Sequence, residues 1–193
     1  CERMLAIHRD NPRVMMIAGF NPVGAGVKSP YYFLSHNPSI WGWACWRDRW
    51  AKYDIRMSSW PNQKIIKRLK YLPLYVREYF IDMFNRTKSG EINTWDYQYL
   101  FLNQVNNRLS VIPNYNMISN IGFNSDGTHT FNTDSPMSNV ASEALPKEII
   151  HPEYIYPNYI ADNYTLEKEM PSFFQIKTNQ LKGVVRDFLI KIK

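Results

Sequence analysis

Tryptophan density constrains this chain more than any other feature, because four of its six tryptophans lie within the ten residues from Trp41 to Trp50. An indole ring buries a large apolar area and needs a partner for its N–H, so such a segment either packs into a core or offers flat rings to a ligand. Trp46 and Trp50 are four residues apart and would share one face of a helix. Trp41 and Trp43 flank Gly42, where a ring can lie beside an open backbone. Such rings suit the apolar face of a sugar, and a tryptophan-rich corner of the core is the alternative.

The length of 193 residues suits one domain, or a large piece of one, with a real hydrophobic core. No apolar run is long enough to span a bilayer, and no signal-peptide pattern occurs. The chain starts with Cys1 inside an amphipathic pattern that lacks a preceding cap, so we expect it to be part of a longer protein. Its two cysteines form no disulfide framework, which favours a reducing compartment.

The net charge of +6 is unevenly distributed along the chain. Residues 1–90 carry 15 Lys and Arg against 6 Asp and Glu, residues 91–162 carry 2 against 8, and residues 163–193 carry 6 against 3. A basic half beside an acidic half predicts a polyanionic ligand or an anionic membrane surface near the first segment, with a solvated charged face as the alternative. Nucleic acid is the weaker alternative, since the basic residues from Lys64 to Lys70 follow a helical pattern rather than a recognised module.

Hydrophobic periodicity predicts an α/β fold with short strands between helices. The expected strands are 14–18, 31–34, 109–113 and 115–119. The tryptophan segment is expected to be a strand end that runs into a helix over about 44–53. The other expected helices are 62–86 with a break at Pro73, 94–107 with Thr94 as N-cap, and 181–192. The Gly-, Asn- and Pro-rich stretch 122–157 is expected to be a functional loop. The strongly amphipathic terminal helix would either dock on the body of the protein or lie on an anionic leaflet.

Asp96 is the carboxylate whose surroundings best suit catalysis. Transfer of a glycosyl group to a hydroxyl needs a base within hydrogen-bond reach of that hydroxyl, and the flanking Trp95 and Tyr97 would limit water and define the acceptor face. The alternative is a structural carboxylate in the first turn of a helix, stabilised by the helix dipole. Arg47 and Arg49 could bind phosphate through their guanidinium forks or form surface ion pairs.

Three sequence motifs occur in an order that resembles the C-terminal half of family 2 glycosyltransferases. The motifs are Trp41-Gly42-Trp43-Ala44-Cys45-Trp46-Arg47, Trp95-Asp96-Tyr97-Gln98, and Ser119-Asn120-Ile121-Gly122-Phe123 followed by Thr128-His129-Thr130. The likeness is to the bacterial branch described as hemolytic-protein-like or nucleotide-diphospho-sugar transferases, and it covers residues 10–162. The same order more loosely resembles the acceptor half of the eukaryotic N-acetylglucosaminyltransferases that begin complex N-glycans, in which a Trp-Asp pair supplies the catalytic base.

The resemblance implies the acceptor-binding half of a GT-A, Rossmann-like fold in residues 1–162 and a helical extension in residues 163–193. It implies an inverting transfer of sugar from a nucleotide-diphosphate sugar to a hydroxyl of a glycan or glycolipid, with Asp96 as general base. The implied substrate-binding residues are Trp41, Gly42, Trp43, Trp95, Tyr97 and Arg47. Thr128 and His129 would contact the donor diphosphate, or His129 would ligate the metal, whereas His36 and His151 have no neighbours that indicate a metal set.

The sequence departs from the family pattern in one respect. Family members capture Mg²⁺ or Mn²⁺ through an Asp-x-Asp pair, and no Asp-x-Asp occurs in these 193 residues. The nucleotide-binding half is also missing, so we expect this chain alone to be inactive.

The setting implied by the resemblance is bacterial polysaccharide or lipopolysaccharide synthesis. The protein would then be cytoplasmic, at the inner leaflet, with membrane contact through the basic terminal helix and no nucleic-acid partner. Two other functions stay open. One is a non-catalytic carbohydrate-binding module that uses the tryptophans, and the other is a basic domain for anionic membrane or nucleic acid.

Overall fold

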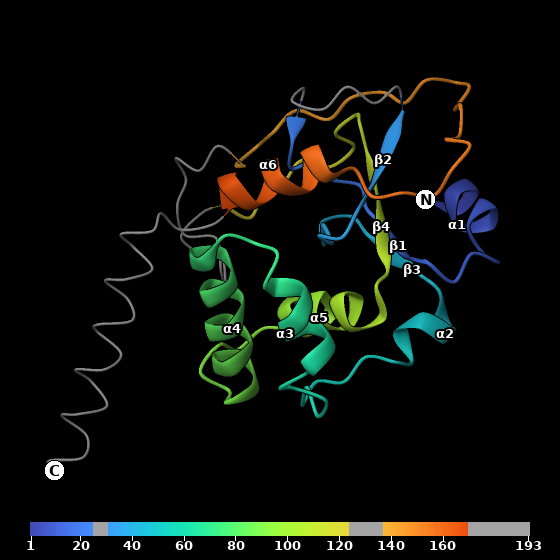
Figure 1. Ribbon diagram of the computed structural model, residues 1–193. Helices are drawn as coiled ribbons and strands as arrows, with labels where there is room; N and C mark the ends of the chain where they lie inside the picture. The colour runs from blue at the N-terminus through green and yellow to red at the C-terminus, as the bar shows by residue number, and fades with distance from the viewer. Residues whose placement is uncertain (25–30, 124–136, 170–193) are drawn as a thin grey trace, which may run out of the picture.

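A computed structural model describes residues 1–24, 31–123 and 137–169 and shows a small mixed sheet flanked by helices (Figure 1). The strands are β1 (Val14–Ile17), β2 (Tyr32–Ser35), β3 (Ala44–Cys45) and β4 (Leu109–Pro113). The helices are α1 (Glu2–Ile7), α2 (Arg47–Trp50), α3 (Gln63–Leu69), α4 (Leu74–Lys88), α5 (Asp96–Asn106) and α6 (Tyr159–Glu169). The prediction of an α/β fold is therefore confirmed.

The sheet has the strand order β2-β4-β1-β3. Its two central strands, β1 and β4, are parallel and buried along their whole length, while β2 pairs antiparallel with β4 and β3 antiparallel with β1. Because β1 and β4 are parallel, the loops that follow them leave the sheet at the same edge. The chain reaches this edge again at Trp41 and Gly42, just before β3, and the Gly19 N–H there donates to the Trp41 carbonyl at 3.3 Å.

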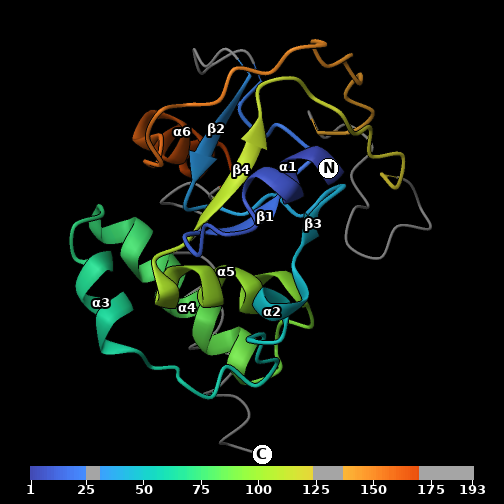
Figure 2. The same cartoon turned by 90° about the vertical axis from the view of Figure 1, so that its right-hand side faces the viewer.

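Helices cover both faces of the sheet, with α1 on one side and α6 on the other (Figures 1 and 2). The α1 face buries residues of all three longer strands, including Ile17, Leu34 and Val111. On the opposite face, Phe33 and Ile112 pack with Ala161 of α6. The period-2 alternation of a sheet thus supplies two apolar layers from strands of only four or five residues.

The other long helices, α3, α4 and α5, gather below the sheet in both views (Figures 1 and 2). They enclose a second core that contains Trp60, Phe80, Phe84 and Phe101. The predicted break at Pro73 is confirmed, since α3 ends at Leu69 and α4 starts directly after the proline. The Asn62 side chain accepts hydrogen bonds from two N–H groups of the first turn of α3, which fixes where that helix begins.

A strand does run into a helix in the tryptophan segment, but the predicted bounds of the helix, 44–53, are wrong. Ala44 and Cys45 pair with β1, and only the four residues of α2 that follow are helical. Edge pairing with a buried strand overrides the helical spacing of the tryptophans, as tertiary context commonly does. The chain then turns away at Asp54, whose carboxylate accepts the N–H groups of Arg56 and Ser58.

Two further expectations are wrong. Residues 115–119 form no strand: the Met117 N–H donates to the Gly19 carbonyl, and the Asn116 amide donates to the Ile118 and Ala141 carbonyls, so side-chain bonds replace a ladder. Thr94 is not the N-cap of α5, because that position belongs to Trp95.

The C-terminal part of the chain is described only to residue 169. The expected boundary between residues 162 and 163 falls inside α6, where Ala161 and Asp162 are buried. The predicted helix 181–192 lies outside the described residues. In the parts of the chain that the structure describes, no helix has the length and apolarity that crossing a bilayer requires.

Candidate functional site

A cavity of about 270 Å³ lies where α4, α5, α6 and the segment after β2 meet. Its described walls come from six parts of the chain: Phe20; Asn37, Pro38, Ser39, Ile40 and Trp41; Tyr79, Phe80 and Met83; Asp96, Tyr97 and Leu100; Met137; and Leu166. Rings and aliphatic side chains dominate the walls, and the polar side chains of Asn37, Ser39 and Asp96 interrupt them. A largely apolar hollow with a few convergent polar groups is typical of small-molecule and sugar sites.

Asp96 is the first residue of α5, as the structural alternative expects, and it also lines the cavity. Its carboxylate Oδ1 accepts hydrogen bonds from the Thr94 hydroxyl and, at 2.9 Å, from the Tyr97 N–H. Both bonds go to Oδ1, and among the described residues no hydrogen bond goes to the second oxygen, Oδ2.

Trp41 lines the cavity and packs on Phe20 and Phe123, with ring centroids 4.5 and 5.7 Å away. Gly42 follows at φ +58°, in the left-handed region that glycine tolerates best. A Cβ on Gly42 would lie 2.3 Å from Cγ1 of Ile118, so this position requires glycine for space as well as for conformation. Gly42 therefore turns the chain between two tryptophans and does not itself line the cavity.

Trp43 lies on the other side of this turn, in a group of five rings that we call the open cluster. Its members are Trp43, Trp50, Tyr53, Trp95 and Tyr99. Trp43 stacks on Trp95 at 5.2 Å, and Trp50 stacks on Tyr53 at 4.7 Å with an interplanar angle of 6°. Tyr99 is fully buried beneath the stacks, whereas Trp50 and Trp95 are 39% and 36% exposed. The cluster is thus a packed base with an exposed aromatic surface.

The open cluster and the cavity meet at the start of α5, where Trp95 belongs to the first and Asp96 to the second. The Tyr53 hydroxyl donates to the Trp95 carbonyl at 3.1 Å. Burial, followed by the charges of Asp96 and Asp54, raises the pKa of Tyr53. Tyr53 is therefore an electrostatic neighbour of the Asp96 carboxylate.

The two arginines of α2 have different environments. Arg47 is exposed and is not a described wall of the cavity, so the structure does not bring it to the other predicted site residues. Arg49 is 3% exposed and donates to the carbonyls of His8, Arg9 and Asn11 after α1. Its guanidinium lies 3.3 Å from the Trp46 ring, a cation–π contact. Arg49 thus serves the fold and has no part in the cavity.

Thr128 and His129 lie outside the described residues. Among the residues that are described, no group of three or more His, Cys, Asp and Glu side chains could hold a metal ion. The Nδ1 of His151 lies 3.1 Å from the Tyr32 hydroxyl, and His36 Nδ1 lies 3.4 Å from the Arg108 carbonyl. Both histidines therefore have structural partners.

Sequence reasoning missed the α6 wall of the site. Asp162 is 6% exposed, and its Oδ1 accepts from the Ser35 hydroxyl at 2.5 Å and from the His36 N–H at 3.2 Å. Burial raises the pKa of Asp162, although both hydrogen bonds act in the opposite direction. The Asn37 amide donates to the Asp162 carbonyl at 3.3 Å, which joins α6 to the cavity wall. No local signal marks a contact between residues so far apart in the sequence.

Comparison of the chain with protein-family models, curated proteins and solved structures found no match.

Proposed function

We propose that this chain is the acceptor-binding part of a GT-A type glycosyltransferase that uses a nucleotide-diphosphate sugar. The proposal is supported chiefly by Asp96, the carboxylate chosen from sequence, which lines the same cavity as Trp41 and Tyr97. An aromatic wall beside a carboxylate and small polar side chains suits a sugar, which offers both C–H faces and hydroxyls. The resemblance of the three sequence motifs to family 2 enzymes supports the reaction class.

In the proposed reaction, Asp96 acts as general base toward an acceptor hydroxyl. The free carboxylate oxygen takes the hydroxyl proton while the acceptor oxygen forms a bond to the anomeric carbon of the donor, and the bond from that carbon to the diphosphate breaks. The diphosphate leaves with the electron pair of the broken bond. Because the acceptor oxygen attacks from the opposite face, the anomeric centre is inverted. Thr94 and the Tyr97 N–H hold the other carboxylate oxygen in place during this step.

The metal implied by the resemblance is not part of this proposal. Among the described residues that line the cavity, Asp96 carries the carboxylate. The small polar side chains beside it are the Asn37 amide and the Ser39 hydroxyl. Mg²⁺ is usually bound through one or two carboxylates together with substrate phosphates, and the described residues offer no acidic cluster for it. The proposed step therefore uses the described residues alone.

The proposed acceptor is a glycan or glycolipid hydroxyl in bacterial polysaccharide or lipopolysaccharide synthesis, in the cytoplasm at the inner leaflet. The open cluster lies directly beside Asp96 and would contact the acceptor sugar that follows the reacting one. Trp95 and Trp43 would then contribute to acceptor binding outside the cavity.

The test is an Asp96→Asn substitution in the complete protein, assayed for transfer from a panel of UDP-, GDP- and dTDP-sugars. Loss of the base should lower kcat about a hundredfold to ten-thousandfold while donor binding stays unchanged. Asp48→Asn is the matched control, since Asp48 also lies in the first turn of a helix but is exposed on α2. Transfer at the wild-type rate in the Asp96 variant would refute the assignment of the base.

A second function, a non-catalytic carbohydrate-binding module, is favoured by the exposure of Trp50 and Trp95. Glycan-array binding that persists with a chelator and is lost in Trp50→Ala and Trp95→Ala, without transfer by the complete protein, would support it over the enzyme.

A further inference from the structure

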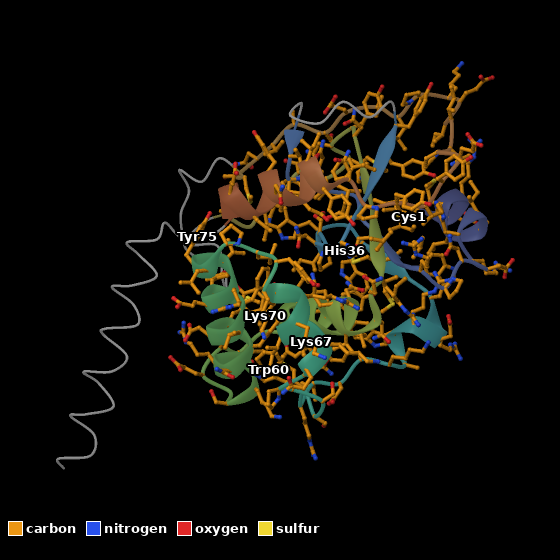
Figure 3. The ribbon with its side chains drawn as sticks, viewed as in Figure 1. Cys1, His36, Trp60, Lys67, Lys70 and Tyr75 are labelled. Carbon is orange, nitrogen blue, oxygen red and sulfur yellow. The ribbon has the colours of Figure 1, made fainter. Side chains whose placement is uncertain are left out.

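A lysine-rich, acid-free segment of the basic half includes helix α3 and the turn that follows it. From Ile55 to Arg77 the sequence contains six Lys and Arg and no Asp or Glu. The three lysines Lys64, Lys67 and Lys70 recur at every third position along α3 and its C-cap, and all three are exposed. Figure 3 shows Lys67 and Lys70 projecting from α3 in the helical layer.

No ion pair joins these lysines to a carboxylate among the residues that the structure describes. Within the residues that the structure describes, the ion pairs join Arg86 to Asp82 and to Glu91, on α4 and just after it. Arg68, the other cation of α3, instead donates to the Gln104 carbonyl of α5 and is part of the helix packing. The exposed charge of α3 is therefore left to solvent or to an anionic partner.

Two exposed apolar side chains adjoin the lysines. Tyr71, on the short turn between α3 and α4, is 91% exposed, and Leu74, the first residue of α4, is 59% exposed. Tyrosine is enriched where a membrane meets water, and lysine side chains extend their apolar stems along such a boundary while the ammonium group reaches the phosphates. Leucine gains nothing from contact with a nucleic-acid backbone, so the combination favours lipid over nucleic acid.

We infer that Lys64, Lys67, Lys70, Tyr71 and Leu74 form a docking surface for an anionic phospholipid bilayer. The lysines would bind the headgroup phosphates, and Tyr71 and Leu74 would insert at the boundary between headgroups and acyl chains. This surface is separate from the terminal helix 181–192, and it does not depend on the proposed enzymatic function.

The position of the surface has a consequence for the cavity, and this step rests on the proposed function. Leu74 is the first residue of α4, and Tyr79 on the same helix lines the cavity. Five residues of helix correspond to a rise of about 8 Å. A bilayer docked on the surface would thus lie close to the cavity wall, where it could present a lipid-linked acceptor.

The experiment measures co-sedimentation of the full chain with phosphatidylcholine vesicles that do or do not contain phosphatidylglycerol. Each lysine near an anionic leaflet strengthens binding about fivefold, so the triple variant Lys64→Gln, Lys67→Gln and Lys70→Gln should bind about a hundredfold more weakly. The matched control, Arg9→Gln with Lys52→Gln and Lys147→Gln, removes the same charge from exposed positions elsewhere and should change binding little.

A second variant separates insertion from charge. Tyr71→Ser with Leu74→Ser should weaken vesicle binding roughly tenfold at both low and high salt, whereas binding through the lysines should fall as salt rises. Circular dichroism checks that all variants fold, as exposed substitutions normally do.

Three results would overturn the inference. The first is equal binding by the α3 triple variant and its charge-matched control. The second is loss of binding only when Lys182, Arg186 and Lys191 of the terminal segment are changed to Gln. The third is binding of an oligonucleotide but not of phosphatidylglycerol vesicles.

Discussion

The second core, enclosed by α3, α4 and α5, and the open cluster beside the cavity both contain Trp and Tyr or Phe rings, but the rings pack differently. In the core, Trp60 is 3% exposed, its indole N–H donates to Asn85 Oδ1 at 2.9 Å, and its ring meets Phe84 and Phe101 edge-on. In the open cluster, Trp43 and Trp95 stack nearly parallel, and the second ring keeps 36% of its surface exposed. Edge-on contacts fill space in all directions, whereas stacks leave ring surface for another molecule.

Removal of one tryptophan from each group gives the largest expected difference. Trp60→Ala should lower the free energy of unfolding by about 3–5 kcal/mol, because it leaves a large cavity in a closed core. Trp95→Ala should cost only about 1 kcal/mol, the scale of one aromatic pair, since much of the ring is already in water. Urea unfolding of both variants measures the two losses in the free energy of unfolding. Similar losses would mean that the open cluster is an ordinary part of the core.

A substitution at the turn between the two tryptophans should have an intermediate effect. Gly42→Ala places a Cβ against Ile118 at a positive φ and should destabilise the fold by about 2–3 kcal/mol. Gly24→Ala is the matched control, because its φ of +61° is nearly the same and nothing lies within 4 Å of its Cβ position. Thermal unfolding of the two variants compares them, and an equal loss would show that conformation alone, without the contact to Ile118, explains the glycine.

The smallest effect concerns the electrostatic link between the open cluster and the cavity. The raised pKa of Tyr53 means that the folded state keeps its proton above the pH, near 10, at which the unfolded chain ionises. The contribution of Tyr53 to stability is therefore present below about pH 10 and is lost as the pH rises through the folded pKa. Asp96→Asn should lower the pKa of Tyr53 because it removes a nearby negative charge.

An ultraviolet titration of phenolate absorbance, with Tyr53→Phe to assign the signal, measures this change. A Tyr53 pKa that does not respond to the Asp96 substitution would show that the carboxylate is not ionised or not close.

Local patterns predicted the parts of the fold that depend on local chemistry. Pro73 marked the break between α3 and α4. Helix α5 ends at Asn106, and its C-cap is Asn107 at φ +50°, a left-handed conformation that asparagine adopts at helix ends. The start of the helix predicted over residues 44–53 was wrong, because the pairing of Cys45 with Met16 is a long-range contact that the spacing of Trp46 and Trp50 does not indicate.

The candidate site was also predictable only where local sequence motifs determine it. Asp96 and Trp41 were chosen from their motifs, and both line the cavity. Trp43 was grouped with Trp41 because they are two residues apart, but the turn at Gly42 sends them to different sides. Ser39 and Leu166 carry no motif, and only the docking of α6 brings them to one wall.

The segment from Asn37 to Trp41 is fixed at both ends. Asp162 binds the chain at one end and Gly19 at the other, through bonds that span up to 127 positions in the sequence. During synthesis on the ribosome, this wall stays incomplete until α6 has emerged and docked. A nascent chain that stops before Leu166 would already contain the sheet strands and Asp96, yet it would have no complete chamber in which that carboxylate could meet a sugar.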